Sequence, residues 1–331
     1  MKAIKFFAIS AMAAAMITSC SSEDELSQSN YPSDNIVRVT AGVNNAKTRA
    51  EGQGVTAMDK PFSLTIVNKN ASKYTYTDKV FSKSSGDWAC SETLLWQKSD
   101  ALVDIVAFAP AQTGKFNGVY AEGSIQPITY SVASDQSSDQ STSSDNNDLL
   151  YYYAKNFNPG ESLDKGKLNI QFNHAFCMID INVTLGTEFN KPSIPTTSPI
   201  VKVTLGGTKI AANVDVTNAA SVVTASGEAT ATDITTTNGS FTTAADPEKN
   251  AISRFSCIAI PQTVAEKTFK VSLMTAGKRY EWTSAEPVEL KSGYRYTLNL
   301  SMGNDVVLLK GGSISATPWT EITSDKPLET D

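Results

Sequence analysis

The stretch Ala-Phe-Cys-Met-Ile-Asp-Ile-Asn-Val-Thr-Leu, residues 175–185, decides the fold class of this 331-residue chain. Its length and its apolar, β-branched residues are typical of a strand in the middle of a sheet. No part of the chain shows the long 3.6-residue periodicity of an amphipathic helix. We therefore expect an all-β protein.

Further strand candidates, separated by turn-forming residues, lie on both sides of this stretch. They are residues 36–43, 62–67, 101–108, 148–154, 200–205, 256–261, 268–273 and 294–300. Short strands at such spacing favour β-sandwiches, and the chain length indicates two of them. We expect an N-terminal sandwich over residues 36–168 and a C-terminal sandwich over residues 169–331.

The chain begins with features of an export signal. Lys2 and Lys5 precede an uncharged run, residues 6–17, which is too short to span a bilayer. The run leads into Ile17-Thr18-Ser19-Cys20, which resembles a bacterial lipobox. We expect residues 1–19 to be a lipoprotein signal peptide and Cys20 to carry palmitate or similar acyl chains, which anchor a protein in a membrane.

An acidic cluster, Ser-Ser-Glu-Asp-Glu at residues 21–25, follows the cysteine. It resembles the surface-export signal of Bacteroidales lipoproteins, and the alternative is a plain solvated tether. With either interpretation, residues 20–35 form an acidic tether. We expect the protein to be anchored by lipid in the outer membrane and exposed at the cell surface.

The composition argues against several classes of function. A net charge of −6 without a basic stripe argues against nucleic-acid binding. The single histidine, His174, excludes multi-histidine zinc sites, and its alternation with apolar residues favours a structural role in a strand. No phosphate-binding loop or nucleophile elbow is present, and we expect no cofactor and no enzymatic activity. The alternative that the residue types leave open is an enzyme that uses two carboxylates, such as a glycosidase.

Three cysteines remain after Cys20, and they lack the spacing of a metal site. Cys177 and Cys257 lie in apolar runs, which favours buried free thiols. Whether two of Cys90, Cys177 and Cys257 form a disulfide is left open by the sequence.

Aromatic residues suggest a second kind of function. Tyr151, Tyr152 and Tyr153, with Trp88 and Trp96, are candidates for a stacking platform on a lipoprotein that binds a glycan or a host protein without polymerising. Aromatic residues that alternate along a strand more often pack on a core. The polar tract at residues 134–147 is expected to form a long exposed loop.

One set of motifs runs across most of the chain. Its members are the lipobox, strand 36–43 followed by Lys-Thr-Arg-Ala at 47–50, Val-Asp-Ile-Val-Ala-Phe-Ala-Pro at 103–110, Phe-Asn-His-Ala at 172–175, Gly-Tyr-Arg-Tyr-Thr-Leu-Asn-Leu at 293–300 and Pro318-Trp319. Together they resemble the fimbrillin family, the two-domain subunits of type V pili in Bacteroidales. The resemblance implies two tandem, transthyretin-like Greek-key β-sandwiches. It also implies a structural subunit of a fimbria that contributes to cell adhesion and has other pilin subunits as partners.

The resemblance further implies assembly by strand exchange. An arginine-specific protease would cut after Arg49 and leave Ala50 as the new N-terminus. The released strand would carry the apolar face formed by Val37, Val39, Ala41 and Val43. Its place would be taken by a donor segment of another subunit, residues 305–320, with the apolar residues Val306, Val307, Leu308, Leu309, Ile314 and Ala316. The alternative is that these are ordinary final strands, and the sequence does not separate a stalk subunit from an anchor or a tip.

Overall fold

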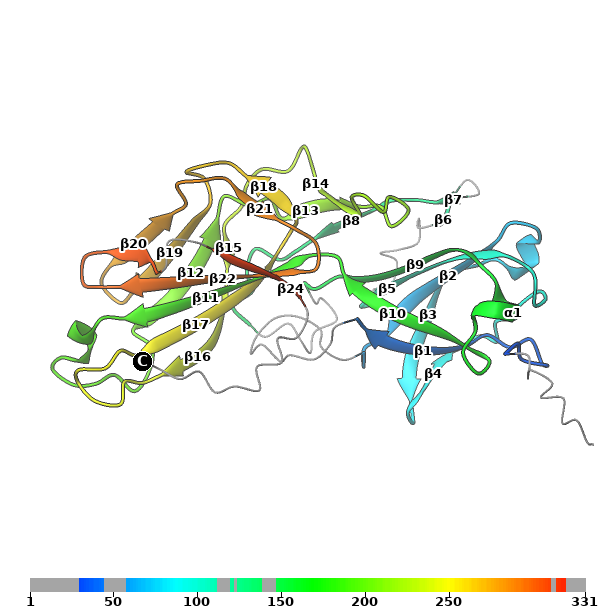
Figure 1. Ribbon diagram of the computed structural model, residues 1–331, viewed down its shortest axis with the longest axis horizontal. Helices are drawn as coiled ribbons and strands as arrows, with labels where there is room; N and C mark the ends of the chain where they lie inside the picture. Colours follow the sequence, from blue (N-terminus) through cyan, green and yellow to red (C-terminus); the bar gives the residue numbers. More distant parts are fainter. Residues whose placement is uncertain are drawn as a thin grey trace, which may run out of the picture.

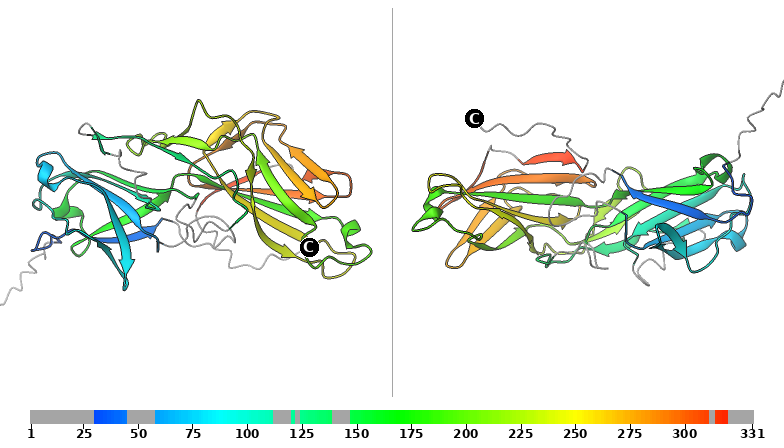
Figure 2. Two further views of the ribbon diagram at one scale, coloured as in Figure 1. Left: turned by 180° about the vertical axis from the view of Figure 1, so that it is seen from behind. Right: turned by 90° about the horizontal axis from the view of Figure 1, so that it is seen from below.

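The computed structural model of the chain is drawn in Figure 1. Its buried apolar side chains form two clusters. The structure describes residues 30–44, 58–111, 120–121, 124–138, 147–310 and 314–319. The smaller cluster forms within the first part of the chain and the larger one mainly within the second. The molecule is elongated, with the blue to green strands at one end and the green to red strands at the other (Figures 1 and 2).

Among the described residues, a seven-stranded sheet packs against the smaller cluster. In spatial order its strands are β1 (Arg38–Val43), β10 (Lys167–His174), β9 (Leu150–Phe157), β5 (Val103–Ala109), β2 (Phe62–Asn68), β3 (Tyr76–Ser84) and β4 (Asp87–Cys90). The order is far from the order in the chain, because β10 lies between β1 and β9. The sheet is antiparallel except for the parallel pairing of β1 with β10.

The second part of the chain is a β-sandwich. One sheet, with β24 on its edge, contains β16 (Thr237–Thr242), β17 (Ile252–Ala259), β11 (Cys177–Leu185), β22 (Tyr294–Met302), β23 (Val307–Leu309) and β24 (Ser315–Pro318). The other contains β15 (Ile234–Thr235), β12 (Ile200–Gly206), β19 (Lys270–Thr275) and β20 (Arg279–Thr283). Buried side chains of both sheets, such as Ile181 and Leu298 on one and Val203 and Leu273 on the other, form the larger cluster.

The remaining described elements are short. They are β6 (Tyr120–Ala121), β7 (Ser124–Ile125), β8 (Ile128–Ser131), β13 (Ala211–Val214), β14 (Val223–Ala225), β18 (Gln262–Val264), β21 (Val288–Leu290), the helix α1 (Pro159–Ser162) and the 3-10 turns η1 (Ser72–Tyr74) and η2 (Thr187–Asn190). The expectation of an all-β protein is confirmed, and the stretch at 175–185 forms β11 between β17 and β22. The β-sandwich class is also confirmed.

The two clusters share the strand β5. All of its residues are buried, and successive side chains point to opposite faces of a strand. Val103 and Ile105 belong to the smaller cluster, whereas Val106 and Phe108 belong to the larger one. Strand β8, which precedes β9 in the chain, pairs with β13 of the second part. The division of the chain at residue 168 stays a prediction.

In the described part of the polar tract, residues 134, 135, 137 and 138 are exposed, whereas Gln136 and Asn147 are buried. The Gln136 side chain is fully buried, and its amide accepts from the Ile258 N–H at 2.8 Å and donates to the Ile258 carbonyl at 2.9 Å. Asn147, at the other end of the tract, is also buried. Burial is feasible because the Gln136 amide offers β17 the same donor and acceptor that a neighbouring strand would offer.

The central position of β11 leads to a stability prediction. We expect Ile181→Ala to lower the free energy of unfolding by about 2–5 kcal/mol, because the fully buried side chain leaves a cavity between packed sheets. Urea unfolding followed by circular dichroism measures the change. The control is Val201→Ala, at a side chain that is 57% exposed, which should change stability by less than about 0.5 kcal/mol. Equal losses in the two variants would contradict the placement of β11 in the core.

Candidate functional site

Strand β1 forms the end of the seven-stranded sheet. It pairs in parallel with β10 over its whole length, from Arg38 opposite Lys167 to Val43 opposite Phe172. On its other side, the backbone hydrogen bonds lie only at its beginning, from Val37 N–H to the Leu94 carbonyl at 2.9 Å and from Trp96 N–H to the Asn35 carbonyl at 2.8 Å, as far as the described residues show. Most of β1 therefore has a single partner strand.

The side chains of β1 and of Val37, the residue before it, contribute to the smaller cluster. Val37, Val39 and Val43 are buried there, and Ala41 is half-buried against it. Burial of one valine is worth about 1.5–3 kcal/mol, so the three together contribute on the order of 5–9 kcal/mol. This is comparable with the whole stability of a typical domain. If β1 were removed and not replaced, an apolar slot beside β10 would be open to water.

The candidate donor residues lie along the outer edge of β22. Strand β23 pairs with the end of β22, Val307 opposite Met302, and β24 pairs with its beginning, Ala316 opposite Tyr296. Val307 is buried and Leu309 is half-buried, whereas Val306 and Leu308 are 49% and 59% exposed. The segment is apolar on both faces, although its own subunit covers only one of them.

Strand β24 ends at an aromatic stack that the sequence did not reveal. The indole ring of Trp319 lies on the His174 ring, with 3.9 Å between the ring centroids and an interplanar angle of 8°. His174 Nδ1 lies 3.0 and 2.9 Å from the two carboxylate oxygens of Asp148. All three residues are buried. The sequence offered Pro318-Trp319 and a strand histidine as signals, but nothing in it paired them with each other or with Asp148.

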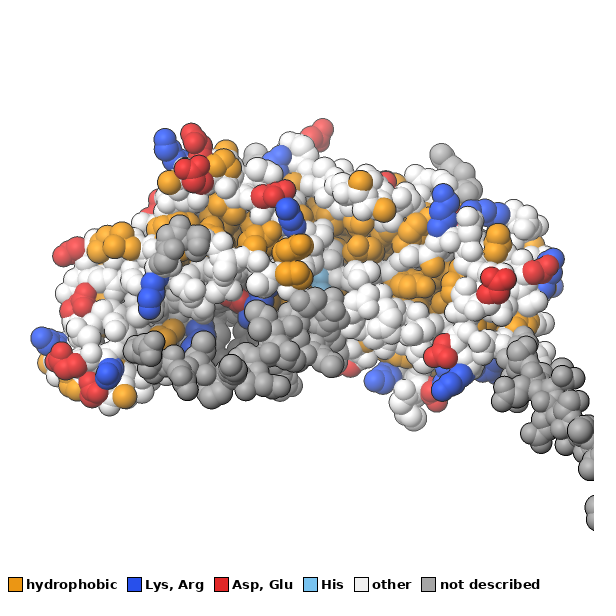
Figure 3. Space-filling model, viewed as in Figure 1, with side chains coloured by type: hydrophobic (Ala, Val, Ile, Leu, Met, Phe, Trp, Pro, Cys, Tyr) orange, Lys and Arg blue, Asp and Glu red, His pale blue; other side chains and the backbone are white. Residues whose placement is uncertain are grey.

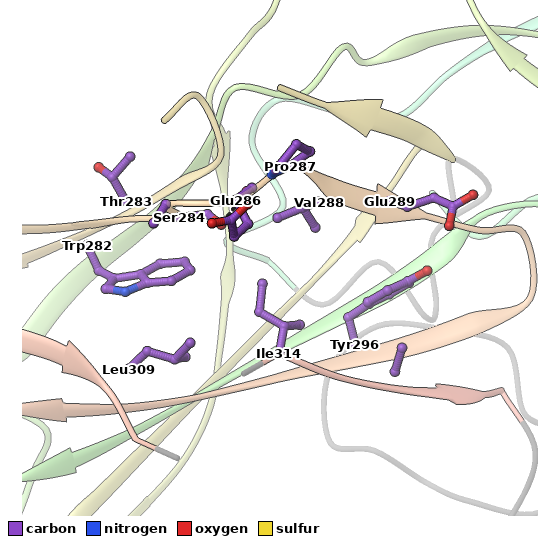
Figure 4. Close-up of a pocket in the computed structure, with 12 residues that line it drawn as sticks. Trp282, Thr283, Ser284, Glu286, Pro287, Val288, Glu289, Tyr296, Leu309 and Ile314 are labelled. Atoms are coloured by element: carbon purple, nitrogen blue, oxygen red, sulfur yellow. Dashed lines mark hydrogen bonds between the residues drawn. The ribbon is translucent and has the colours of Figure 1, made fainter. Parts of the chain in front are cut away.

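A cavity of about 540 Å³ lies between β24 and the loop that connects β20 with β21. Trp282, Val288, Tyr296, Leu309 and Ile314 point toward it in Figure 4, and Ala316 completes this wall. The Tyr296 hydroxyl accepts from the Lys291 N–H at 2.8 Å, and burial raises the pKa of Tyr296 to about 12, so the phenol is neutral. Figure 3 shows hydrophobic side chains gathered across this part of the surface.

The aromatic residues considered as a binding platform are mostly occupied by packing. Trp96 is buried and stacks with Phe157, and Trp88 packs edge-on against Phe62. Tyr151 and Tyr153 are half-buried against the larger cluster, and Tyr152 is half-buried against the smaller one. The tyrosines alternate between the two faces of β9 and do not form one exposed platform.

The three cysteines of the described chain are free. Cys177 and Cys257 are buried, and burial raises the pKa of both thiols, so neither is a thiolate at neutral pH. No group of three or more acidic, histidine or cysteine side chains in the described ranges has the arrangement of a metal site.

Cys20, Arg49 and Ala50 lie outside the described residues. Every helix in the described part of the chain falls short of the length and hydropathy needed to cross a membrane.

A family model described as fimbrillin-like matches residues 48–319. The chain belongs to the fimbrillin-like family. The resemblance inferred from the sequence motifs is thereby confirmed. The match includes β23, β24 and Trp319 of this fimbrillin-like protein and leaves β1 outside. No curated protein matches the chain.

Solved structures from three Bacteroides species resemble this fimbrillin-like chain. A candidate cell adhesion protein of Bacteroides ovatus has a TM-score of 0.56 and 18% identity, over 85% of this chain and 96% of its own. A candidate cell adhesion protein of Bacteroides uniformis has a TM-score of 0.53 and 15% identity, over 87% and 100%. A fimbrial protein of Bacteroides vulgatus has a TM-score of 0.52 and 14% identity, over 86% and 99%. At these identities the likeness shows a shared fold.

The placement of β1 leads to a second prediction. We expect Val39→Asp to destabilise the uncut chain by several kcal/mol, because it puts an unpaired carboxylate into the apolar slot beside β10. The control is Thr40→Asp, since Thr40 is the next residue and faces solvent. Urea midpoints of the two variants and the parent chain give the comparison. If Val39→Asp is tolerated as well as Thr40→Asp, β1 does not fill the slot.

Proposed function

We propose that the protein is a structural subunit of a cell-surface fimbria that contributes to cell adhesion. Membership of the fimbrillin-like family supports the role of a pilus subunit, and the shared fold with a fimbrial protein of Bacteroides vulgatus agrees with it. The partners are other pilin subunits, of the same or a related kind. The protein acts through its surfaces and strand edges, without a cofactor.

The first step is export as a lipoprotein. Residues 1–19 are removed, and acyl chains on Cys20 hold the protein in the outer membrane with its sandwiches at the cell surface. Residues 20–35 link the lipid to β1. The sequence motif around Cys20 supports this step.

The second step is the removal of β1. The chain between β1 and β2 contains Lys-Thr-Arg-Ala at residues 47–50, so an arginine-specific protease that cuts after Arg49 separates β1 and the lipid from the rest. The departure of β1 leaves the backbone edge of β10 and the slot of Val37, Val39, Ala41 and Val43 without a partner. An unpaired edge beside an apolar slot is a template for β-strand addition.

The third step is the filling of the slot by the donor segment, residues 305–320, of another subunit. The observation that carries this proposal is the exposure of Leu308 on β23, and of Val306 just before it, where the other face of the segment is already apolar. Within its own subunit the segment leaves these large apolar side chains in water. The slot beside β10 offers burial for alternate apolar side chains, as it does for those of β1.

The proteolytic step makes a direct prediction. We expect the purified chain to form a ladder of multimers after limited digestion with an arginine-specific protease, with Ala50 as the N-terminal residue of the assembled product. An Arg49→Ala variant should stay monomeric under the same digestion. Arg38→Ala, at an exposed arginine of β1, is the matched control and should assemble like the parent chain. Size-exclusion chromatography and mass spectrometry provide the measurements, and cut chain that stays monomeric at high concentration would exclude strand exchange.

The donor segment can be tested without disturbing its own subunit. We expect Leu308→Asp to leave the unfolding free energy of the uncut chain within about 0.5 kcal/mol, because the side chain is exposed there. The same variant should fail to assemble after digestion, because the carboxylate would enter the apolar slot of the next subunit. Val201→Asp, at an equally exposed valine of β12, is the control and should assemble. Normal ladders from Leu308→Asp would show that β23 is not the inserted strand.

A further inference from the structure

The segment that contains β24 pairs with β22 over four residues, and its most buried side chain is that of its last described residue. Trp319 is 6% exposed, stacks on His174, and donates its backbone N–H to the Gly293 carbonyl at 2.6 Å. By contrast, Ser315, Ala316 and Pro318 of β24 are exposed, and Thr317 is half-buried. Most of the burial near the end of this segment therefore comes from one indole ring.

The cavity beside β24 reinforces this dependence. Ile314 and Ala316 line a pocket of about 540 Å³ that is open to solvent, so this side of the segment has few packed neighbours. A side chain that borders an open pocket makes fewer dispersion contacts than one in a close-packed core. The pairing of β24 with β22 then depends strongly on the indole ring of Trp319, the residue that follows β24.

The surface that receives Trp319 belongs to β10. His174 is the last residue of that strand, and its ring is oriented by the bond from Nδ1 to the buried carboxylate of Asp148. We refer to His174 and Asp148, with the Gly293 carbonyl, as the Trp319 socket. The position of the socket depends on where the end of β10 is held.

The part of β10 that leads up to the socket is held largely by β1. Residues 167–172 of β10 pair with β1, whereas only Asn173 and His174 pair with β9 in the described structure. The end of β1 reaches almost to the socket, because Asn44 N–H donates to the Phe172 carbonyl at 2.7 Å and the Asn44 amide donates to Asn173 Oδ1 at 2.9 Å. Asn173 is the residue before His174. The buried side chains of Leu168, Ile170 and Phe172 keep β10 in the core without β1, but its backbone loses most of its partners.

We propose that β10 couples the two strands within one subunit, so that the loss of β1 loosens the Trp319 socket and releases β24. The inference rests on the proposed function, in which β1 is removed and the C-terminal segment is given to a neighbour. It adds that the opening of the slot and the freeing of the donor are linked events. An uncut subunit keeps β24 closed on β22, and a cut subunit exposes it.

Hydrogen–deuterium exchange of the full-length, monomeric chain at low concentration tests the coupling. The readout is the exchange rate of the backbone amides of residues 315–317, relative to those of β19, which reports whether the second sandwich stays folded. We expect Trp319→Ala to raise the rate in β24 at least about tenfold, which corresponds to 1.4 kcal/mol. We expect cleavage after Arg49 with removal of β1 to raise it by a similar factor.

Asn44→Ala provides a test that leaves β1 in place. It removes the side-chain bond to Asn173 and should raise the exchange rate in β24 by a smaller factor. Thr40→Ala is the matched control, because it removes a side-chain bond from β1 to Asn169, far from the socket. It should leave β24 unchanged.

Two results would overturn the proposal. One is an unchanged exchange rate in β24 of Trp319→Ala, which would show that the socket does not hold the segment. The other is rapid exchange in Trp319→Ala but an unchanged rate after the removal of β1, which would show that the two strands are independent. Neither result depends on polymer formation, so ladders could still form in a subunit without the coupling, and the failure of the proposed function would appear separately.

Discussion

The parallel pairing of β1 with β10 is the contact on which the first sheet depends. β1 pairs with six of the eight residues of β10, and two buried valines of β1, with Val37 just before it, pack into the smaller cluster. A strand at a sheet edge normally leaves one row of donors and acceptors to water, and proteins limit this exposure because such edges recruit other chains. Here β1 itself covers the edge of β10. The edge is closed only as long as a segment near the N-terminus stays attached.

The other end of the described chain shows the complementary arrangement. β23 and β24 cover the outer edge of β22, but they bury few side chains, and Leu308 is among the most exposed large apolar residues in the described structure. A large apolar side chain in water is tolerated singly, yet an apolar strand exposed on one face is a feature of surfaces that meet a partner. The two regions thus differ in packing. The slot beside β10 is well filled by β1, whereas β23 and β24 are loosely packed on β22.

Two strands, β5 and β10, connect the packing of the first part of the molecule to that of the second. β5 contributes to both clusters with its two faces, and β10 passes directly into β11 through the buried residues Ala175 and Phe176. A change at one end of β10 therefore has a short covalent and packed route to the second sheet. Bacteroides proteins at 14–18% identity share this fold, because many different sequences keep the alternation of apolar residues and the volume of the core.

The sequence by itself determined the all-β class, the central position of residues 175–185 and the family, because strand alternation and turn chemistry are local properties. It also placed strands close to those observed at β2, β5, β12, β19 and β22. Only the tertiary structure decided that β1 runs parallel to β10, that Gln136 is buried against β17, and that Trp319 lies on His174 beside Asp148. Such contacts join residues that are distant in the chain, and their geometry follows from how sheets cross and close, which no local pattern specifies.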